Sequence, residues 1–202
     1  MIVIGVLVSG RGSNLQAIID NIKNGKLNAK INCVISDNQD ALALKRAKEV
    51  GVPAYYIYPG VHKTYLESDR ELEYIKCLCE HKVELVCLAG FMRILHSDFL
   101  QEFKDRIINI HPALLPSFPG LHAQRQALEY GVKITGATVH FVNEGIDAGP
   151  VIIQRAVEVK DNDTEELLTQ RILKVEHQIY SETIQLFAEG KLKIVGRKVI
   201  VE

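Results

Sequence analysis

The sequence predicts an α/β protein whose doubly wound, mostly parallel sheet is covered by helices on both faces. Short β-branched runs alternate with amphipathic segments of helical period over residues 1–110, which is the pattern of βαβ units. Runs such as IVIGVLV are nearly continuous in apolar residues, as strands buried on both faces require. The second half has two longer strand patterns around a turn-rich segment, which predicts an antiparallel C-terminal part.

The N-terminal half supplies five expected strands separated by helices. In the helical segments apolar residues recur with a spacing near the helical period, and each segment keeps a polar face. The helices are expected at Leu15–Lys23, Ala41–Val50 and Leu66–His81. The strands are expected at Ile2–Val8, Ile31–Ser36, Ala54–Tyr58, Val83–Ala89 and Arg106–Ile110.

The C-terminal half begins with a proline-rich stretch. Pro112, Pro116 and Pro119, followed by Gly120, predict an extended and irregular loop. Asp163 is expected to start a long helix, because Glu166 follows at the spacing of a capping box. The elements expected after the loop are a helix at 124–130, strands at 134–142 and 151–159, a helix at 164–188 and a hairpin in IVGRKVIVE.

Composition excludes several classes of protein. Apolar residues make up 47% and charged residues 24%, which is typical of a globular domain, and 202 residues suffice for a single one. The 24 basic and 25 acidic residues give a net charge of −1 without a basic run, so neither nucleic acid nor a membrane is an expected partner. The apolar run at 2–8 is too short to span a bilayer and has no basic region before it, so we expect a cytoplasmic protein.

The cysteines and histidines do not indicate a metal site. The seven histidines show no ligand spacing. The cysteines lie in apolar periodic segments with neither a disulfide framework nor a zinc-ligand spacing, so free thiols in a reducing compartment are expected. These cysteines are Cys33, Cys77, Cys79 and Cys87.

The first candidate site is SGRGSN, residues 9–14, which follows the first expected strand and opens the first helix. Glycine lets the backbone approach a ligand, and a helix N-terminus presents free N–H groups to an anion. Ser13, with Gln16 three residues later, is the expected N-cap. Leu15 stands where a dinucleotide fingerprint needs its third glycine, and Asp37 after the second strand fits either a ribose contact or an ordinary turn. The loop therefore predicts a site for one phosphate group rather than NAD, with a plain tight turn as the alternative.

The second candidate site is formed by Asn109 and His111. They lie two residues apart at the carboxyl end of the fifth expected strand, so their side chains point to the same face. Ligands of open α/β sheets bind outside the carboxyl ends of the strands. An amide donor beside an imidazole suits stabilisation of an oxyanion together with proton transfer. A buried histidine with a purely structural hydrogen bond is the alternative.

The third candidate is Asp147, within the turn-rich segment NEGIDAGP at 143–150. An aspartate in a glycine-rich loop is more often a turn residue than a catalytic one. Its role changes if the loop folds back over His111. The carboxylate would then raise the pKa of the histidine and keep it protonated.

With these motifs identified, the chain resembles the folate-dependent phosphoribosylglycinamide formyltransferases over essentially all of its 202 residues. The NIHP…LLP…PG pattern is typical of the wider formyltransferase superfamily, and the SGxGSN start separates these enzymes from their relatives. The length agrees, because methionyl-tRNA formyltransferase has an extra C-terminal domain and formyltetrahydrofolate hydrolase an extra N-terminal one. The segments that carry the resemblance are SGRGSNLQAIID, LAGFMRIL, NIHPALLPSFPGLHA, HFVNEGIDAGPVI and KVEHQIY.

The resemblance implies a Rossmann-like formyltransferase fold and a single domain over residues 1–202. Its N-terminal half would bind the phosphate of the ribonucleotide and its C-terminal half the folate. The implied reaction transfers the formyl group of 10-formyltetrahydrofolate to the amine of 5-phosphoribosylglycinamide, in de novo purine (IMP) biosynthesis. It needs no metal, and the implied protein is a monomer or a homodimer.

The resemblance also implies which residues act. Asn109, His111 and Asp147 match the catalytic trio. The ribonucleotide would bind at Gly12, Ser13 and Asn14 through its phosphate and at Glu176 through its ribose. The folate would contact Met92, Arg93, Ile94, Leu95, Asn109, Asn143, Glu144, Gly145, Ile146 and Asp147.

The sequence departs from the family at one position. Many members have an arginine that contacts the folate tail where this chain has Tyr65, and Lys63 or Arg70 is a possible substitute. Three other functions remain as alternatives: a related formyltransferase or hydrolase with the same trio, a nucleotide-binding regulatory module without chemistry, and an NAD-dependent oxidoreductase. The regulatory module gives no reason for the trio, and Leu15 disfavours the oxidoreductase.

Overall fold

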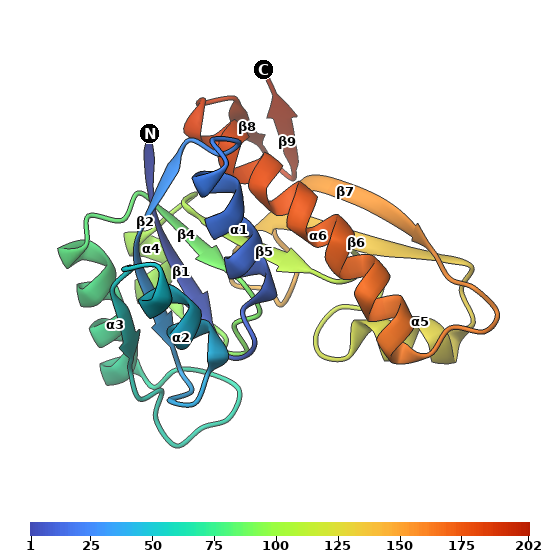
Figure 1. Ribbon diagram of the computed structural model, residues 1–202, viewed down its shortest axis with the longest axis horizontal. Helices are drawn as coiled ribbons and strands as arrows, with labels where there is room; N and C mark the ends of the chain where they lie inside the picture. The colour runs from blue at the N-terminus through green and yellow to red at the C-terminus, as the bar shows by residue number, and fades with distance from the viewer. The chain divides into compact units, whose positions relative to one another are not determined.

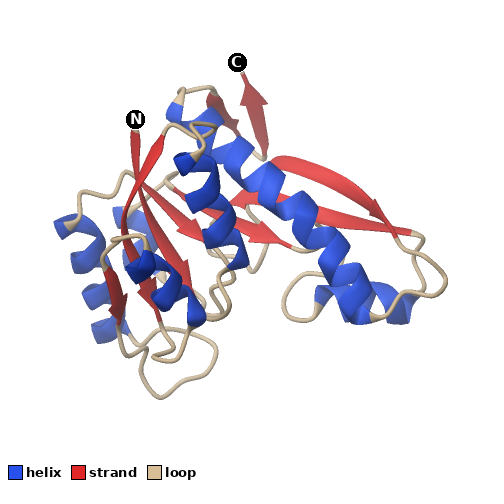
Figure 2. Ribbon diagram, in the orientation of Figure 1, coloured by secondary structure: helices blue, strands red, loops and turns tan.

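The computed structural model describes all residues, 1–202, and its contacts divide the chain into two compact units. The first unit is Met1–Asn109 and the second is Ile110–Glu202. Figure 1 shows the order of the elements, and Figure 2 distinguishes the helices from the strands. No helix combines the length and the apolar character that crossing a membrane would require.

The first unit is built on a parallel sheet with the strand order β3-β2-β1-β4-β5. The central strand β1 pairs with β2 from Ile2↔Ala29 to Val8↔Ser36, and with β4 from Ile4↔Leu85 to Leu7↔Leu88. Strands β1 and β2 are almost wholly buried, which explains their continuous apolar sequences. The strands are β1 (Ile2–Val8), β2 (Ala29–Ser36), β3 (Ala54–Tyr56), β4 (Leu85–Leu88) and β5 (Ile107–His111), whose last two residues belong to the second unit.

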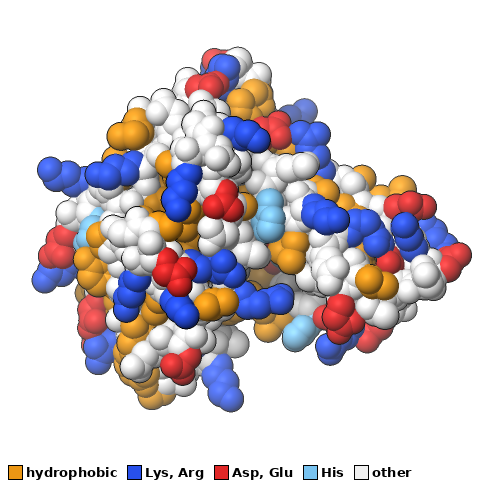
Figure 3. All heavy atoms as spheres, in the orientation of Figure 1, with side chains coloured by type: hydrophobic (Ala, Val, Ile, Leu, Met, Phe, Trp, Pro, Cys, Tyr) orange, Lys and Arg blue, Asp and Glu red, His pale blue; other side chains and the backbone are white.

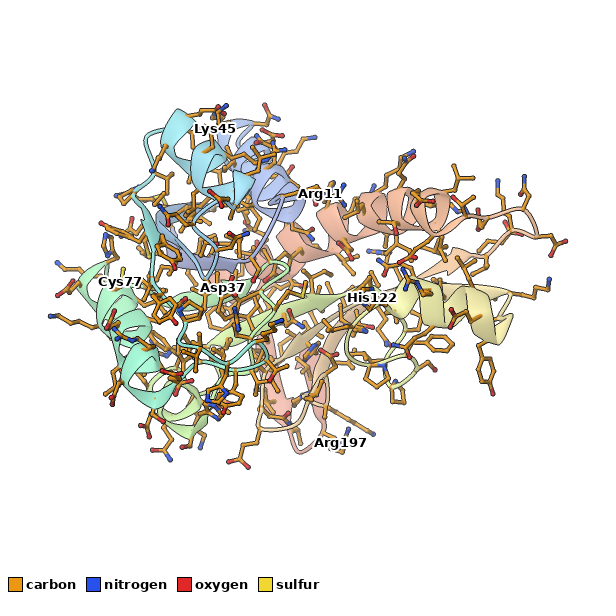
Figure 4. The ribbon with its side chains drawn as sticks, turned by 90° about the horizontal axis from the view of Figure 1, so that it is seen from below. Arg11, Asp37, Lys45, Cys77, His122 and Arg197 are labelled. Carbon is orange, nitrogen blue, oxygen red and sulfur yellow. The ribbon has the colours of Figure 1, made fainter.

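Helices cover both faces of this sheet. Figure 4 shows α1 and α2 on one side of the strands and α3 on the other. The helices are α1 (Ser13–Lys23), α2 (Leu42–Glu49), α3 (Ser68–Glu80) and the short α4 (Ser97–Glu102). The core of the unit consists of fully buried aliphatic side chains from the strands and from α1, among them Ile4, Leu7, Leu15, Ile35 and Leu85.

The second unit is built from two hairpins in the strand order β6-β7-β9-β8. Strands β6 and β7 are antiparallel from Ile134↔Glu158 to His140↔Val151, with a register shift between Val139 and His140. The helix α6 packs along this hairpin, as Figure 1 shows, and also contacts α5. The elements are α5 (Ala123–Tyr130), β6 (Ile134–Phe141), β7 (Val151–Glu158), α6 (Glu165–Ala188), β8 (Leu192–Val195) and β9 (Lys198–Val201).

The predicted class is confirmed: parallel strands in the first half and antiparallel hairpins in the second. One helix, α4, was not predicted, because six residues are too few for a helical period. The buried Glu71 carboxylate accepts a hydrogen bond from the backbone N–H of His96, 2.7 Å away, and so satisfies a donor at the start of α4.

The expected cap of the long helix is wrong by one residue. The N-cap of α6 is Thr164, whose hydroxyl accepts a hydrogen bond from the Leu167 N–H at 3.3 Å. Asp163 instead accepts one from the backbone of Lys160 and pairs with Arg171. Asp163 and Thr164 are both good capping residues, and the contact of Asp163 with Arg171, eight residues later, leaves Thr164 as the cap. The local sequence spacing does not indicate this contact.

Candidate active site

The predicted pair of His111 and Asp147 is present within the second unit. His111 is the last residue of β5, and Asp147 lies in the loop between β6 and β7. The imidazole Nδ1 is 3.3 Å from Asp147 Oδ2, and the two side chains are 5% and 12% exposed. The loop therefore folds back over the histidine, which was the condition for a catalytic reading of Asp147.

The second ring nitrogen of His111 also faces an acceptor. His111 Nε2 is 2.8 Å from the carbonyl oxygen of Phe118, in the loop between β5 and α5. Because a carbonyl oxygen only accepts, Nε2 carries the proton in this arrangement. Both nitrogens thus point at oxygen atoms, a geometry that the doubly protonated imidazolium satisfies best.

Burial of the imidazole opposes the charged form and has the largest effect on the pKa of His111. Desolvation lowers the pKa of His111 below its usual value, although the Asp147 carboxylate and the Phe118 carbonyl both act to raise it. The Asp147 carboxylate therefore acts on this pKa in the expected direction, but burial acts against it and the net direction is downward. The missing factor was the depth of the imidazole, which a sequence does not display.

Asp147 is held as a carboxylate by several donors. Burial would raise its pKa, but the nearby His140 imidazole, the hydrogen bond from the Gly120 N–H and the His111 imidazole lower it below its ordinary value. The Gly120 nitrogen is 2.7 Å from Asp147 Oδ2, and His140 Nε2 is 3.6 Å from Oδ1. His140 Nδ1 lies 2.8 Å from the Phe141 carbonyl, which leaves Nε2 facing the carboxylate. Asp147 is thus placed between two buried imidazoles.

His140 contacts Asp147, and the spacing of the sequence did not predict this contact. It lies near the end of β6, and its spacing alone fits a structural histidine. The register shift between Val139 and His140 alters the alternation of side chains at the point where β6 leads into the 143–150 turn. A bulge of this kind has no sequence signature in a run such as ATVHF.

The predicted phosphate loop of the first unit lies at the N-terminus of α1. Gly12 is the N-cap with φ 70° and ψ 37°, and Ser13 is the first helical residue, so the expected cap at Ser13 is wrong. A Cβ at Gly12 would lie 2.6 Å from the Ala43 Cβ, so both the backbone angle and the packing require glycine. The first helical hydrogen bond runs from the Gln16 N–H to the Gly12 carbonyl, which leaves the preceding N–H groups without a helical acceptor.

The residue Asn38 after β2 and the helix α2 brace this loop. Asn38, just after β2, donates from its side chain to the Ser9 carbonyl at 3.3 Å. Arg46 of α2 donates to the Arg11 carbonyl at 2.9 Å and to the Gln16 side chain at 3.0 Å. Figure 4 shows Arg11 and Lys45 on this side of the unit. The loop is a helix N-terminus held by side-chain hydrogen bonds and flanked by basic residues, which suits an anion.

The segment at 91–95 differs in part from the expected apolar slot. Phe91 and Leu95 are buried, and Phe91 packs against Tyr74 with ring centroids 6.0 Å apart. Met92 and Ile94 are the apolar side chains that remain open, 54% and 39% exposed. Arg93 does not stand as an isolated charge, because its Nε is 2.6 Å from Asp37 Oδ2. The surface offered to a ligand is therefore smaller and less charged than the sequence suggested.

The remaining predicted residues fall in both units. Asn109 is half-buried on β5 in the first unit, and Glu176 is buried on α6 in the second. Residues 143–146 form a turn in which the Asn143 side chain accepts a hydrogen bond from the Gly145 N–H at 3.1 Å, and Ile146 is exposed.

A cavity in the first unit is separate from all of these residues. It has a volume of about 720 Å³ and lies where β2, β3 and β4 begin, at the edge opposite the phosphate loop. Its wall includes Ile19, Ile31, Val52 and His81, and none of the predicted site residues lines it. The candidate site is therefore identified by its residue chemistry and not by the volume of a cavity.

The visible face in Figure 3 has basic and acidic side chains interspersed, without a large patch of either charge.

Comparison with known proteins places the chain in a family. The formyl transferase family pattern matches residues 2–184. A crystal structure of glycinamide ribonucleotide transformylase 1 from Symbiobacterium toebii is 51% identical, with a TM-score of 0.95 over 100% of this chain and 94% of that one. The phosphoribosylglycinamide formyltransferase of Escherichia coli (strain K12) is 44% identical over 94% of this chain and 88% of its own length.

A human relative is much longer. The trifunctional purine biosynthetic protein adenosine-3 of Homo sapiens is 44% identical over 95% of this chain, but the match covers only 19% of that protein. The full-length agreement with the bacterial enzymes therefore decides the assignment. The chain belongs to the formyl transferase family and, within it, to the phosphoribosylglycinamide formyltransferases.

Proposed function

We propose that the protein transfers the formyl group of 10-formyltetrahydrofolate to the amine of 5-phosphoribosylglycinamide. The products are formylglycinamide ribonucleotide and tetrahydrofolate, in de novo purine (IMP) biosynthesis. The observation that carries the proposal is the His111–Asp147 pair, 3.3 Å apart in a chain that is 51% identical to a glycinamide ribonucleotide transformylase. Both small molecules are substrates, and the reaction we propose uses no metal.

In the proposed mechanism the neutral amine attacks the formyl carbon, and the carbonyl oxygen becomes an oxyanion. Asn109 and His111, two residues apart on β5, donate to that oxygen. The negative charge acts in the same direction as Asp147 and raises the proton affinity of the imidazole against the effect of burial. Collapse of the intermediate breaks the bond to the folate nitrogen, which takes up the proton that the amine releases, through water and Asp147.

The binding residues are proposed from the family. Gly12, Ser13 and Asn14 hold the substrate phosphate at the start of α1, and Glu176 binds the ribose. The donor contacts the segments 92–95 and 143–147 and the side chain of Asn109. The support in the structure is the helix N-terminus for the phosphate and the exposed Met92 and Ile94 for the donor.

We also propose a single formyltransferase domain over residues 1–202, a cytoplasmic location and a monomeric or homodimeric state. Free thiols at all four cysteines are compatible with a reducing compartment. Sedimentation at several protein concentrations distinguishes a monomer from a dimer.

One assay tests the reaction. The purified chain is incubated with 5-phosphoribosylglycinamide and 10-formyltetrahydrofolate, and the deformylated folate is followed by absorbance. We expect turnover that depends on the amine substrate and that gives one formylated product per folate released. Folate release without the amine would instead indicate a hydrolase, and binding of the ribonucleotide without turnover would indicate a regulatory module.

A further inference from the structure

The segment 91–95 leaves β4 and has little regular structure to hold it. Its main chain makes three hydrogen bonds to its surroundings: the Met92 N–H donates to Ser9 Oγ at 2.9 Å, the Ile94 N–H to the Thr64 carbonyl at 2.9 Å, and the Leu66 N–H to the Ile94 carbonyl at 3.4 Å. A single bridge between Tyr65 and Ile94 is its only sheet-like pairing. The shape of the segment must therefore depend on further anchors.

Phe91 and Leu95 anchor the segment through buried apolar side chains, and Arg93 is its polar anchor. Its Nε donates to Asp37 Oδ2 at 2.6 Å, and its Nη1 donates to the His62 carbonyl. The two charged side chains are 16% and 5% exposed, and the other oxygen of Asp37 is buried without a hydrogen-bond partner. One guanidinium thus joins the end of β2, the loop that contains His62 and the 91–95 segment. Figure 4 labels Asp37 near the middle of the first unit.

Resting on the proposed function, we propose that Arg93 and Asp37 are positioning residues for the formyl donor. Their ion pair fixes the main chain of residues 92–95 in the shape that the donor binds. The donor then contacts the main chain and the apolar side chains of Met92 and Ile94, and not the guanidinium. This assignment gives Asp37 a role in place of the ribose contact or ordinary turn that its sequence position suggested.

The chemistry of the pair supports this division of roles. A guanidinium donates from a fixed planar fork, and here two edges of the fork are used inside the protein. Turning Arg93 toward a ligand would leave a buried carboxylate without its counter-charge, which is strongly unfavourable. Lysine has the same charge but no fork, so it cannot bind Asp37 and the His62 carbonyl in the same way.

The alternative is that Arg93 binds the anionic glutamate of the folate through its charge, and ligand truncation distinguishes the two. We would measure the affinity of Arg93→Lys and Asp37→Asn by calorimetry for a 5,8-dideaza analogue of the donor and for the same analogue without glutamate. We expect both variants to bind both ligands about tenfold more weakly, the size of one lost charge-assisted hydrogen bond. The KM for the donor should rise while kcat at saturating donor stays within about threefold, because no reacting atom has moved.

Three results would overturn the proposal. The first is wild-type affinity in Arg93→Lys, the second is an effect of either variant that disappears with the analogue lacking glutamate, and the third is tighter binding of the full analogue by Asp37→Asn. Each would assign the charge of Arg93 to the ligand. As a matched control, the exposed Lys76–Glu80 pair of α3 is changed to Met and Gln, and donor affinity should stay within about twofold.

A purely structural role is tested with the double variant Arg93→Met with Asp37→Leu. Replacing a buried ion pair by apolar residues often restores stability. We expect the melting temperature to recover relative to the single variants while donor affinity stays low. Recovery of donor affinity in parallel with the melting temperature would contradict a positioning role.

The proposed function is read out separately in the same preparation. If the wild-type protein binds the donor analogue but does not formylate the ribonucleotide, the proposed reaction fails and the comparison of variants still decides the role of Arg93. If the wild-type protein does not bind the analogue at all, the positioning proposal is overturned.

Discussion

At the scale of single residues, the balance around His111 determines what the site can do. Its nitrogens face Asp147 and the Phe118 carbonyl, which favours the imidazolium, whereas burial favours the neutral ring. The net effect lowers the pKa of His111 below its usual value. A further negative charge, such as an oxyanion, would act together with Asp147 to raise this pKa.

Removing the carboxylate should therefore expose its contribution. We expect Asp147→Asn to lower kcat by about 10²–10³, or about 3–4 kcal/mol, with little change in KM, because an interaction of the transition state is lost. The pKa of His111 should fall further, since the carboxylate acts to raise it. An NMR titration of the imidazole carbons checks this, and a pKa that ignores the substitution would disprove the coupling.

From the lowered pKa of His111 we expect the stability of the protein to depend on pH. Burial places the pKa of His111 in the folded protein below its unfolded value, so the unfolded chain binds more protons between the two. The free energy of unfolding should thus decrease as the pH falls through the unfolded value of about 6.5. His111→Gln should lose that part of the slope in urea titrations at one pH above and one pH below this value, and an unchanged slope would count against the assignment.

Asp147 acts in a different pH range. Its pKa is lowered in the folded protein, so its stabilisation is present above the unfolded value and is lost as the pH falls through the folded one. That loss lies below about pH 4, outside the range in which His111 titrates. The two contributions can therefore be separated in one pH series.

At the scale of elements, the turn into α1 is the clearest case of a required glycine. Gly12→Ala should destabilise the protein by about 1–3 kcal/mol through its left-handed backbone alone, and the contact with Ala43 adds to this. Gly10→Ala is the matched control, because nothing lies within 4 Å of the added Cβ, and should change stability by less than about 0.5 kcal/mol. Urea unfolding of both variants measures the difference.

A second variant separates the two causes. Gly12→Ala with Ala43→Gly removes the 2.6 Å contact with the Ala43 Cβ but leaves the Cα of residue 43 at 3.0 Å and keeps the unfavourable angle, so it should recover only part of the loss. Full recovery would show that the backbone angle costs nothing at this position. For the same reason, a bulky residue at Gly12 is a poor test of phosphate binding, since it disturbs the packing of α1 on α2 before any ligand is added.

The elements show which parts of the fold a sequence displays. The apolar runs of β1 and β2 and the period of α6 predicted their elements closely, because burial on a regular face repeats along the chain. The caps at Gly12 and Thr164 were each missed by one residue, because tertiary contacts chose between neighbouring residues that suit the role equally well. A single tertiary contact produces no repeated pattern in the sequence, whereas a buried helix or strand face does.

At the scale of the whole molecule, ligand binding should appear as thermal stabilisation. A donor analogue at 100 times its Kd contributes about 2.7 kcal/mol, which for about 200 residues corresponds to a rise in Tm of roughly 5–10 °C. NAD at the same concentration as the analogue should not shift the Tm. A shift with NAD and none with the analogue would favour the oxidoreductase alternative.

The candidate site was predictable in identity but not in its electrostatics. NIHP and the glycine-bracketed Asp147 carry their chemistry in the residue types, so His111 and Asp147 could be chosen from the sequence. The contact between His140 and Asp147, the Arg93–Asp37 pair and the lowered pKa of His111 depend on depth and on distances between segments far apart in the chain. Those quantities exist only after folding.

The hydrogen bond to the Phe118 carbonyl fixes the orientation of the His111 imidazole before any ligand binds. In the free protein this peptide oxygen accepts a hydrogen bond from Nε2, and under the proposed mechanism the oxygen of the reacting group would take its place. Exchange replaces one acceptor by another, and the internal bond that is given up is worth only about 0.5–1.5 kcal/mol. Under the proposed mechanism the imidazole is thus already desolvated and oriented by the loop at 112–122 before the oxyanion forms on the bound donor.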